Sequence, residues 1–179
     1  MTKKPWGGRF SHETDELTEE FTASLSFDRR LSRYDIQGSM AYCEALAQAG
    51  IISPDEKAEI LQALREIEQE MEAGEVPSTA AGEDIHMHIE QRLIEKVGEI
   101  GGKLHTGRSR NDQIALDLRL FLKEEGSGII GLVKTLQSSM VAVADVHRDV
   151  IMPGYTHLRK AQPILFSHHG PNQMSSFSG

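Results

Sequence analysis

The chain has 179 residues, which suffice for one ordinary domain or for a small domain with part of another, but not for two complete large domains. Its net charge of -8 argues against a nucleic-acid partner, because phosphate binding needs clustered lysine and arginine side chains. A single cysteine, Cys43, excludes an intramolecular disulfide and favours the reducing cytoplasm, and the lack of any apolar run of about eighteen residues predicts no membrane-spanning segment.

Three consecutive helices are predicted in the first half of the chain. Gly50, Gly74 and Gly98 follow them, at positions where a helix C-terminus favours a left-handed residue. Ser53-Pro54-Asp55-Glu56 marks the start of the second helix, because it combines a capping serine, a proline at the first helical position and a capping-box glutamate. The stripes expected to be buried are Ile36, Met40, Cys43 and Ala47 in the first helix, Ile60, Leu64, Ile67 and Met71 in the second, and Ile85, Ile89, Leu93 and Val97 in the third. A loop over 75–82 is expected between the second helix and the third.

Residues 99–110 show no helical period and carry glycines, two arginines and a histidine, so we expect a loop that presents polar chemistry. A long helix is predicted after this loop, and a stripe of this length is typical of a helical bundle. Gly126, Gly128 and Gly131 leave open whether that helix bends or breaks. Its apolar stripe comprises Ile114, Leu118, Phe121, Leu122, Ile129, Leu132, Leu136, Met140 and Val143.

Met152-Pro153-Gly154 is expected to end the long helix, with a second loop over Gly154–Pro163. Beyond Phe166 the apolar period is lost, and residues 170–179 are expected to be a disordered tail. The fold class predicted from these patterns is all-α. Residues 1–110 would form a small helical domain, and residues 111–169 the truncated start of a central helical bundle.

Two segments suggest chemistry from their residue types. His105–Gln113 combines hydroxyl, guanidinium and amide groups at a helix start, which suits a carboxylate ligand. The alternative is a plain helix cap, with Ser109 or Asn111 as the capping residue and both arginines in solvent. His157 in the second loop could transfer a proton near neutral pH, although a single loop histidine is more often simply solvated.

His86 and Glu90 lie one helical turn apart and are interpreted as a solvated pair. A metal centre requires more ligands than these two residues provide, so no metal is predicted.

Four stretches closely resemble, in order, signature stretches of the argininosuccinate lyase family. They are Trp6-Gly7-Gly8-Arg9-Phe10, Glu83-Asp84-Ile85-His86, His105–Gln113 and Gly154–Pro163. The resemblance extends over about residues 5–169. The wider superfamily includes fumarase, aspartase and adenylosuccinate lyase, but the Ser-Arg-Asn-Asp-Gln and Gly-Tyr-Thr-His-Leu forms resemble argininosuccinate lyase and its crystallin relatives.

The resemblance implies β-elimination of argininosuccinate to arginine and fumarate, in arginine biosynthesis, by a cytoplasmic homotetramer that uses neither metal nor organic cofactor. It also implies roles for individual residues. His157 would take part in proton transfer as acid, base or orienter, three roles that remain open. The residues expected to bind substrate are Ser24, Asp28, Ser109, Arg110, Asn111, Thr156 and Gln162, and those expected to support the site are Asp84 and His86.

One family signature has no counterpart here. Nothing in the chain resembles the mobile Gly-Ser-Ser-x-Met-Pro-x-Lys loop that carries the catalytic serine base. The family builds each site from three subunits around long central helices, of which only the first is expected here. We therefore expect the chain to be inactive alone. Two alternatives remain: a lyase for another succinyl adduct, and a non-catalytic structural or interaction protein on the same scaffold.

Overall fold

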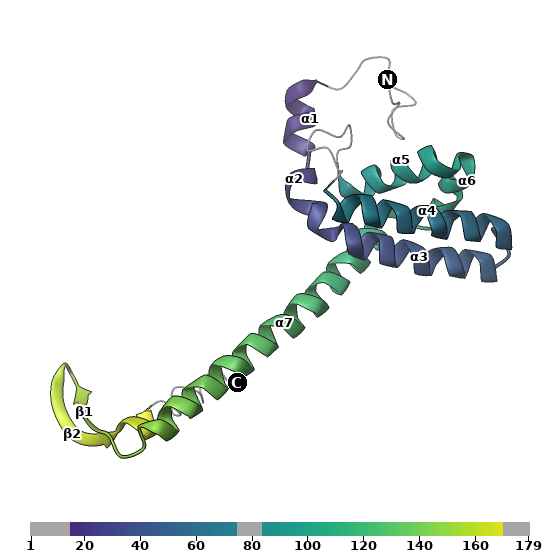
Figure 1. The fold of residues 1–179 in the computed structure, drawn as a ribbon. Coiled ribbons are helices and arrows are strands. Elements are labelled where there is room, and N and C mark those ends of the chain that lie inside the picture. Colours follow the sequence, from purple (N-terminus) through teal and green to yellow (C-terminus); the bar gives the residue numbers. More distant parts are fainter. Residues whose placement is uncertain (1–14, 75–83, 170–179) are drawn as a thin grey trace. The chain divides into compact units, whose positions relative to one another are not determined.

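A computed structural model describes residues 15–74 and 84–169 (Figure 1). The Trp6–Phe10 stretch, Glu83, the expected loop over 75–82 and the expected tail over 170–179 lie outside the described residues. The chain divides into two compact units, residues 1–122 and 123–179. The helices are α1 (Glu16–Thr22), α2 (Leu25–Asp28), α3 (Ser32–Gln48), α4 (Pro54–Glu72), α5 (Ile85–Val97), α6 (Glu99–Gly102) and α7 (Arg110–Val146), with 3-10 turns η2 (Arg29–Leu31) and η3 (Lys103–His105).

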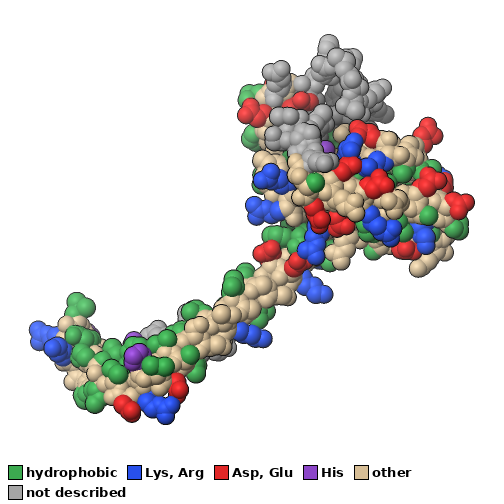
Figure 2. Space-filling view, in the orientation of Figure 1, with side chains coloured by type: hydrophobic (Ala, Val, Ile, Leu, Met, Phe, Trp, Pro, Cys, Tyr) green, Lys and Arg blue, Asp and Glu red, His purple; other side chains and the backbone are tan. Residues whose placement is uncertain are grey.

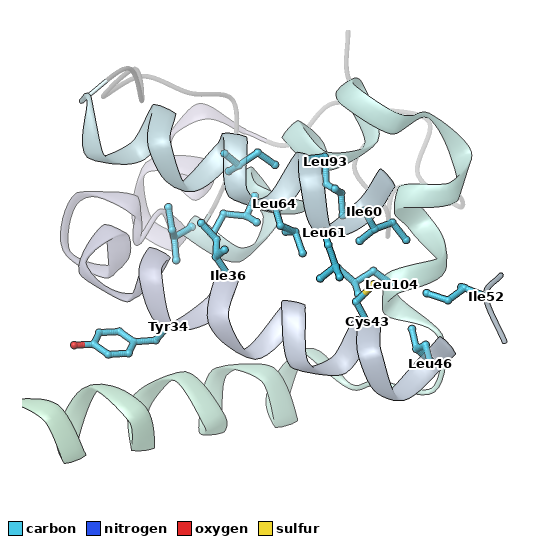
Figure 3. Close-up of a cluster of buried hydrophobic side chains, with 14 of the residues drawn as sticks. Tyr34, Ile36, Cys43, Leu46, Ile52, Ile60, Leu61, Leu64, Leu93 and Leu104 are labelled. Carbon is cyan, nitrogen blue, oxygen red and sulfur yellow. The ribbon is translucent and has the colours of Figure 1, made fainter. Parts of the chain in front are cut away.

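The core of the first unit lies among α3, α4 and α5, which pack against one another (Figure 3). The predicted stripes are confirmed. Ile36, Ile60 and Leu64 are fully buried, and removal of such side chains from water contributes about 1.5–3 kcal/mol each. Cys43 is buried in the same cluster, as its spacing indicated. The outer members of the stripes, Met40, Ala47, Met71 and Val97, are partly buried against it.

The helix ends follow the sequence signals. Ser53 Oγ accepts from the Glu56 amide at 3.2 Å, and the Glu56 carboxylate accepts from the Ser53 amide at 2.9 Å, which completes the capping box. Gly50, Gly74 and Gly98 have φ of +71°, +76° and +69°, so the chain leaves all three helices through a left-handed residue.

The prediction of a loop over 99–110 is wrong for residues 99–105, because α6 and η3 occupy them. These elements are too short to display an apolar period, so the sequence pattern could not reveal them. Gly101 is buried where α6 packs against α5. A side chain there would stand 3.2 Å from the backbone N and Cα of Ile94, so the contact depends on glycine.

Helix α7 is continuous through Gly126, Gly128 and Gly131, so these glycines do not break the long helix. The helix ends at Val146, earlier than expected, and Met152-Pro153-Gly154 belong to a strand instead. Along α7 many apolar side chains are exposed, among them Leu122, Ile129, Leu132, Leu136, Val143 and Val146 (Figure 2). By length and composition α7 could also cross a membrane, a property shared with core helices of soluble proteins.

The expected loop over Gly154–Pro163 is also wrong, because it forms most of a β-hairpin. Strands β1 (Ile151–Thr156) and β2 (Arg159–Leu165) are antiparallel, with a register irregularity between Pro153 and Tyr155. The two-residue turn has positive φ at both His157 and Leu158, a conformation usually signalled by Asn or Gly. Both strands contain prolines and the turn lacks glycine, so the sequence pattern does not predict a hairpin here. The mainly helical character of the fold is confirmed.

The packing of α6 on α5 predicts opposite effects for two adjacent substitutions. Gly101→Ala should lower the free energy of unfolding by about 1–3 kcal/mol, because the new methyl group meets the Ile94 backbone. Gly102→Ala is the control, since nothing lies within 4 Å of its added carbon and alanine favours helix. Urea denaturation of the full chain and both variants measures the difference. Equal midpoints for the two variants would contradict the packing argument.

Candidate functional site

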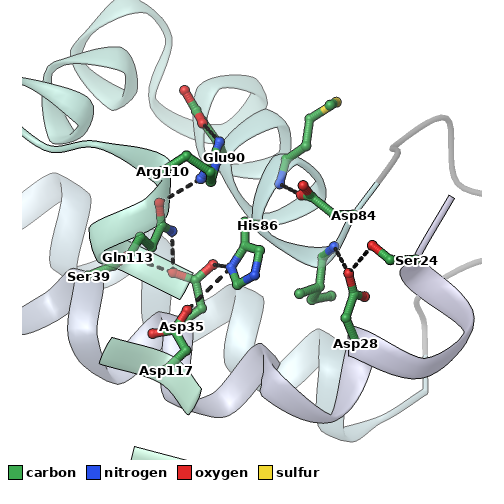
Figure 4. A network of polar contacts seen from close by, with 12 residues as sticks. Ser24, Asp28, Asp35, Ser39, Asp84, His86, Glu90, Arg110, Gln113 and Asp117 are labelled. Atoms are coloured by element: carbon green, nitrogen blue, oxygen red, sulfur yellow. Dashed lines mark hydrogen bonds and ion pairs between the residues drawn. The ribbon is translucent and has the colours of Figure 1, made fainter. Parts of the chain in front are cut away.

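The N-terminus of α5 is held by two carboxylates from the site prediction (Figure 4). Asp84 caps the helix by accepting from the Met87 amide at 2.7 Å. Asp28, from the end of α2, accepts from the Ile85 amide at 3.3 Å and from the Ser24 hydroxyl at 2.5 Å. These bonds satisfy amide groups that a helix start leaves unpaired. Ser24, Asp28 and Asp84 are therefore brought together around one helix end.

His86 lies in the first turn of α5 between two carboxylates from other helices. Its Nδ1 is 3.2 Å from Asp35 Oδ2 on α3 and 3.3 Å from Asp117 Oδ2 on α7. All three side chains are buried, with exposed fractions of 3 % or less. The interpretation of His86 as half of a solvated pair with Glu90 is wrong, because α3 and α7 cover this face of α5 and Glu90 pairs with Arg110 instead.

The charge of the His86 ring is set by these neighbours. Burial alone would lower the pKa of His86, but the contacts to Asp117 and Asp35 outweigh burial and raise the pKa to about 9. Burial raises the pKa of Asp117, an effect that the His86 contact opposes. We take His86 as an imidazolium near neutral pH, because two carboxylates lie beside its Nδ1 and raise its pKa above that range. Neither oxygen of Asp117 makes an aligned hydrogen bond among the described residues, so its compensation is mainly ionic.

Asp35, His86 and Asp117 are also close enough to ligate one metal ion, since their ligand atoms lie within 4.8 Å of one another. The cluster already has a balancing set of charges, however. The imidazolium and the half-buried guanidinium of Arg108, which both carboxylates attract, offset the two negative charges. A metal ion would have to displace the ring proton and sit beside a second cation. The contacts therefore favour an ion-pair cluster over a metal centre.

The N-terminus of α7 carries the segment suited to a carboxylate. Ser109 Oγ accepts from the Asn111 amide at 3.2 Å, so the capping interpretation is confirmed for Ser109. The other part of the capping interpretation, in which both arginines are in solvent, is wrong. Arg108 stacks over the Tyr42 ring at 5.0 Å and donates to Ser39 at 3.3 Å. Arg110 is held by Glu90 and, at 2.6 Å, by Gln113, yet keeps 28 % of its side chain exposed.

A small pocket adjoins this helix start. Its polar lining is contributed by Ser39, His86, Glu90, His105, Arg108, Arg110 and Gln113. Helix N-terminal amides and guanidinium donors at such a place complement a carboxylate. Ser109 and Asn111 are exposed at the same turn, so three of the predicted substrate-binding residues lie within one segment.

Thr156, His157 and Gln162 belong to the second unit and are described by themselves. Thr156 ends β1, His157 forms the first residue of the hairpin turn, and Gln162 lies in β2. All three are exposed, so their polar groups are accessible to a ligand. The hairpin presents His157 at its tip rather than in an irregular loop.

Sequence reasoning missed the roles of four polar residues that organise the first unit: Asp35, Glu90, Gln113 and Asp117. Two of them left a readable signal. Asp35 stands next to Ile36 on the buried side of α3, and Asp117 lies three residues after Ile114 and four before Phe121, at the helical spacing of the α7 stripe. A carboxylate at a buried helical position needs a partner, so each predicts a buried cation nearby.

Comparisons with known proteins place these features in context. The sequence model of a family described as Lyase matches residues 8–174. An argininosuccinate lyase of Syntrophotalea carbinolica is 54 % identical over 169 residues, which cover 94 % of this chain and 37 % of that protein. The argininosuccinate lyase of Pelotomaculum thermopropionicum is 53 % identical, with 94 % and 36 % covered. The chain thus spans little more than a third of the length of these curated relatives.

Solved structures with the same fold include two lyases. The structure of EDDS lyase in complex with formate aligns with a TM-score of 0.71 at 27 % identity, over 90 % of this chain and 31 % of the other. A fumarate lyase from Mesorhizobium sp. BNC1 aligns with a TM-score of 0.67 at 25 % identity, over 92 % of this chain and 38 % of the other.

The buried imidazolium predicts how stability depends on pH. Because the pKa of His86 is raised from 6.5 to about 9 on folding, its contribution is fully present below pH 6.5 and is lost as pH rises through 9. The resulting decrease in the free energy of unfolding is on the order of 3 kcal/mol. Chemical denaturation of the full chain from about pH 6 to about pH 10 measures it.

Two variants identify the source of that alkaline loss. His86→Gln should remove the alkaline loss of stability. His88→Gln, on the same helix, should retain that loss, because burial lowers the pKa of His88 and so keeps its titration out of the alkaline range. If wild type and His86→Gln lose stability equally over this range, the ring is not held as an imidazolium.

Proposed function

The chain belongs to the lyase family whose sequence model matches residues 8–174, and on that basis we propose that it supplies the N-terminal part of an argininosuccinate lyase. The observation that supports this most strongly is the 54 % identity to an argininosuccinate lyase across 94 % of the chain. The proposed reaction is the reversible β-elimination of argininosuccinate to arginine and fumarate. The turn at the start of α7 that carries Ser109, Arg110 and Asn111 offers donors suited to the carboxylates of this substrate, and we call it the proposed anion-binding turn.

The chemistry of the elimination explains why those donors matter. A base removes a proton from the carbon beside a carboxylate, and an acid assists departure of the guanidino nitrogen. Negative charge then spreads into the carboxylate, so fixed hydrogen-bond donors lower the barrier by stabilising that charge as it develops. In our proposal Ser109, Arg110 and Asn111 provide these donors from α7, and Thr156 adds its hydroxyl from the hairpin.

His157 is the proposed proton-transfer residue. A histidine suits that role near neutral pH, and its position at the tip of a two-residue turn leaves the ring exposed to substrate. Gln162, Ser24 and Asp28 are proposed to bind substrate as well, with Asp84 and His86 holding α5 in place. The serine base would come from chain that this sequence does not contain, so we expect the 179 residues alone to be inactive.

The exposed stripe of α7 supports a proposal about assembly. Leu132 and Leu136 are 72 % and 51 % exposed, and they continue a line of apolar side chains along the helix. Such a large apolar face usually packs against other helices. We propose that α7 joins a bundle with helices of other subunits in a homotetramer. A cytoplasmic location fits Cys43, whose buried thiol is not part of a disulfide.

A chimeric enzyme tests the proposed reaction. In the Syntrophotalea carbinolica enzyme, the N-terminal segment that matches this chain is replaced by this chain, and fumarate release from argininosuccinate is followed by ultraviolet absorbance. We expect activity near that of the unmodified enzyme. His157→Asn should reduce it about 100-fold or more, whereas His147→Asn, a second-unit histidine without a proposed role, should not.

The other outcomes distinguish the alternatives. A folded chimera that releases fumarate only from adenylosuccinate would indicate a lyase for another succinyl adduct. A folded chimera without activity on either substrate would favour a non-catalytic scaffold. Fumarate release by the 179-residue chain alone would contradict the view that its serine base is missing.

The proposed packing of α7 predicts self-association of the chain in solution. Leu132→Glu places a charge in the apolar stripe and should shift the chain toward smaller species in analytical ultracentrifugation. Ser138→Glu adds the same charge at an exposed position away from the stripe and should leave the distribution unchanged. A monomeric wild-type chain, or equal effects of both variants, would contradict a role for this face.

A further inference from the structure

Arg110 is restrained by side chains from two helices (Figure 4). Its Nη2 forms a short ion pair with Glu90 on α5, and its Nη1 donates to Gln113 Oε1 on α7 at 2.6 Å. A guanidinium group has five N–H donors, and these two contacts use only two of them. With 28 % of the side chain exposed, Arg110 is partly accessible to a ligand.

The orientation of Gln113 is fixed in turn by the core. Its Nε2 donates to Asp35 Oδ1 at 2.5 Å, so the amide oxygen must face Arg110. Asp35 is fully buried and is held by the Ser39 hydroxyl at 3.1 Å and by His86 at 3.2 Å. A continuous set of polar contacts therefore runs from the buried imidazolium to the partly exposed guanidinium of Arg110. Rotation of the Gln113 amide would place an oxygen against a carboxylate, so this contact has one favourable orientation.

We propose that Glu90 and Gln113 are positioning residues that fix the Arg110 guanidinium as a receptor for a substrate carboxylate; this rests on the proposed function. An unrestrained arginine loses rotamer freedom when it binds a ligand, and that loss weakens affinity. Contacts that already hold the side chain remove most of this cost. Planar guanidinium groups bind carboxylates through two parallel hydrogen bonds, so their orientation affects affinity directly.

The competing interpretation is that Glu90 occupies Arg110 and must be displaced by substrate. The two interpretations predict opposite effects of removing the carboxylate. If Glu90 positions Arg110, Glu90→Ala raises KM. If Glu90 competes with substrate, the same change lowers KM. The sign of the change therefore decides between them.

The kinetic test uses the chimeric enzyme. Glu90→Ala and Gln113→Ala should each raise KM roughly tenfold, the effect of losing one hydrogen bond to a charged group. kcat should fall as well but by a smaller factor, because the carboxylate that Arg110 would bind is already charged in the ground state and gains only part of a charge in the transition state. Glu90→Gln keeps an oxygen that can accept from Arg110 and should restore most of the affinity. Glu95→Gln is the matched control, since Glu95 lies on α5 but pairs with Arg92.

A second measurement does not depend on activity. In the full 179-residue chain, 15N NMR of arginine side chains should resolve separate Nη signals for Arg110, because its contacts hinder rotation of the guanidinium. These signals should merge in Glu90→Ala and Gln113→Ala and stay separate in Glu90→Gln and Glu95→Gln. The experiment needs neither substrate nor the missing serine loop.

The two measurements separate failure of the inference from failure of the proposed function. An inactive chimera with separate Arg110 signals would reject the lyase proposal and retain the restraint of Arg110 by Glu90 and Gln113. An active chimera in which either alanine variant lowers KM or leaves it unchanged would overturn the positioning role. Merged Arg110 signals in the wild-type chain would overturn it as well.

Discussion

The buried contact between His86 and two carboxylates is the constraint on which the first unit depends. Asp35, His86 and Asp117 come from three different helices, so the cluster can form only when α3, α5 and α7 are correctly placed. Removal of one member would leave a buried charge without compensation, which typically costs 3–5 kcal/mol. Apolar packing brings α3, α4 and α5 together without strict geometry, whereas this charge cluster requires one arrangement.

The geometry of the proposed anion-binding turn depends on that cluster. Asp117 lies two helical turns beyond Arg110, and Gln113 connects the region between them to Asp35. The donors proposed to hold a substrate carboxylate are therefore attached to a rigid part of the chain. His157, in contrast, lies at the tip of a hairpin turn. The residue proposed for proton transfer is thus placed by the local geometry of its turn and not by the charge cluster.

Much of the fold follows from local sequence signals, whereas the site follows from them only in part. The capping box at Ser53, the three left-handed glycines and the buried stripes were all predictable because helix ends and helix faces are determined by neighbouring residues. The hairpin was not, since its turn residues His157 and Leu158 are unusual at positive φ. The role of His86 depends on residues far away in the chain, so a pattern of one helical turn led to the wrong partner. The motif around Ser109 was found, but the residues that orient Arg110 were not.

The order of contacts along the chain has a consequence for folding kinetics. Helices α3, α4 and α5 pack mainly with neighbours in sequence, so their association closes short loops and is fast. Asp117 joins Asp35 and His86 only after α7 has returned to α3. We therefore expect its ionic contacts to form on the native side of the folding barrier, where they would slow unfolding without accelerating folding. The charge cluster that orients the binding turn would thus also determine how long the folded first unit persists before it opens.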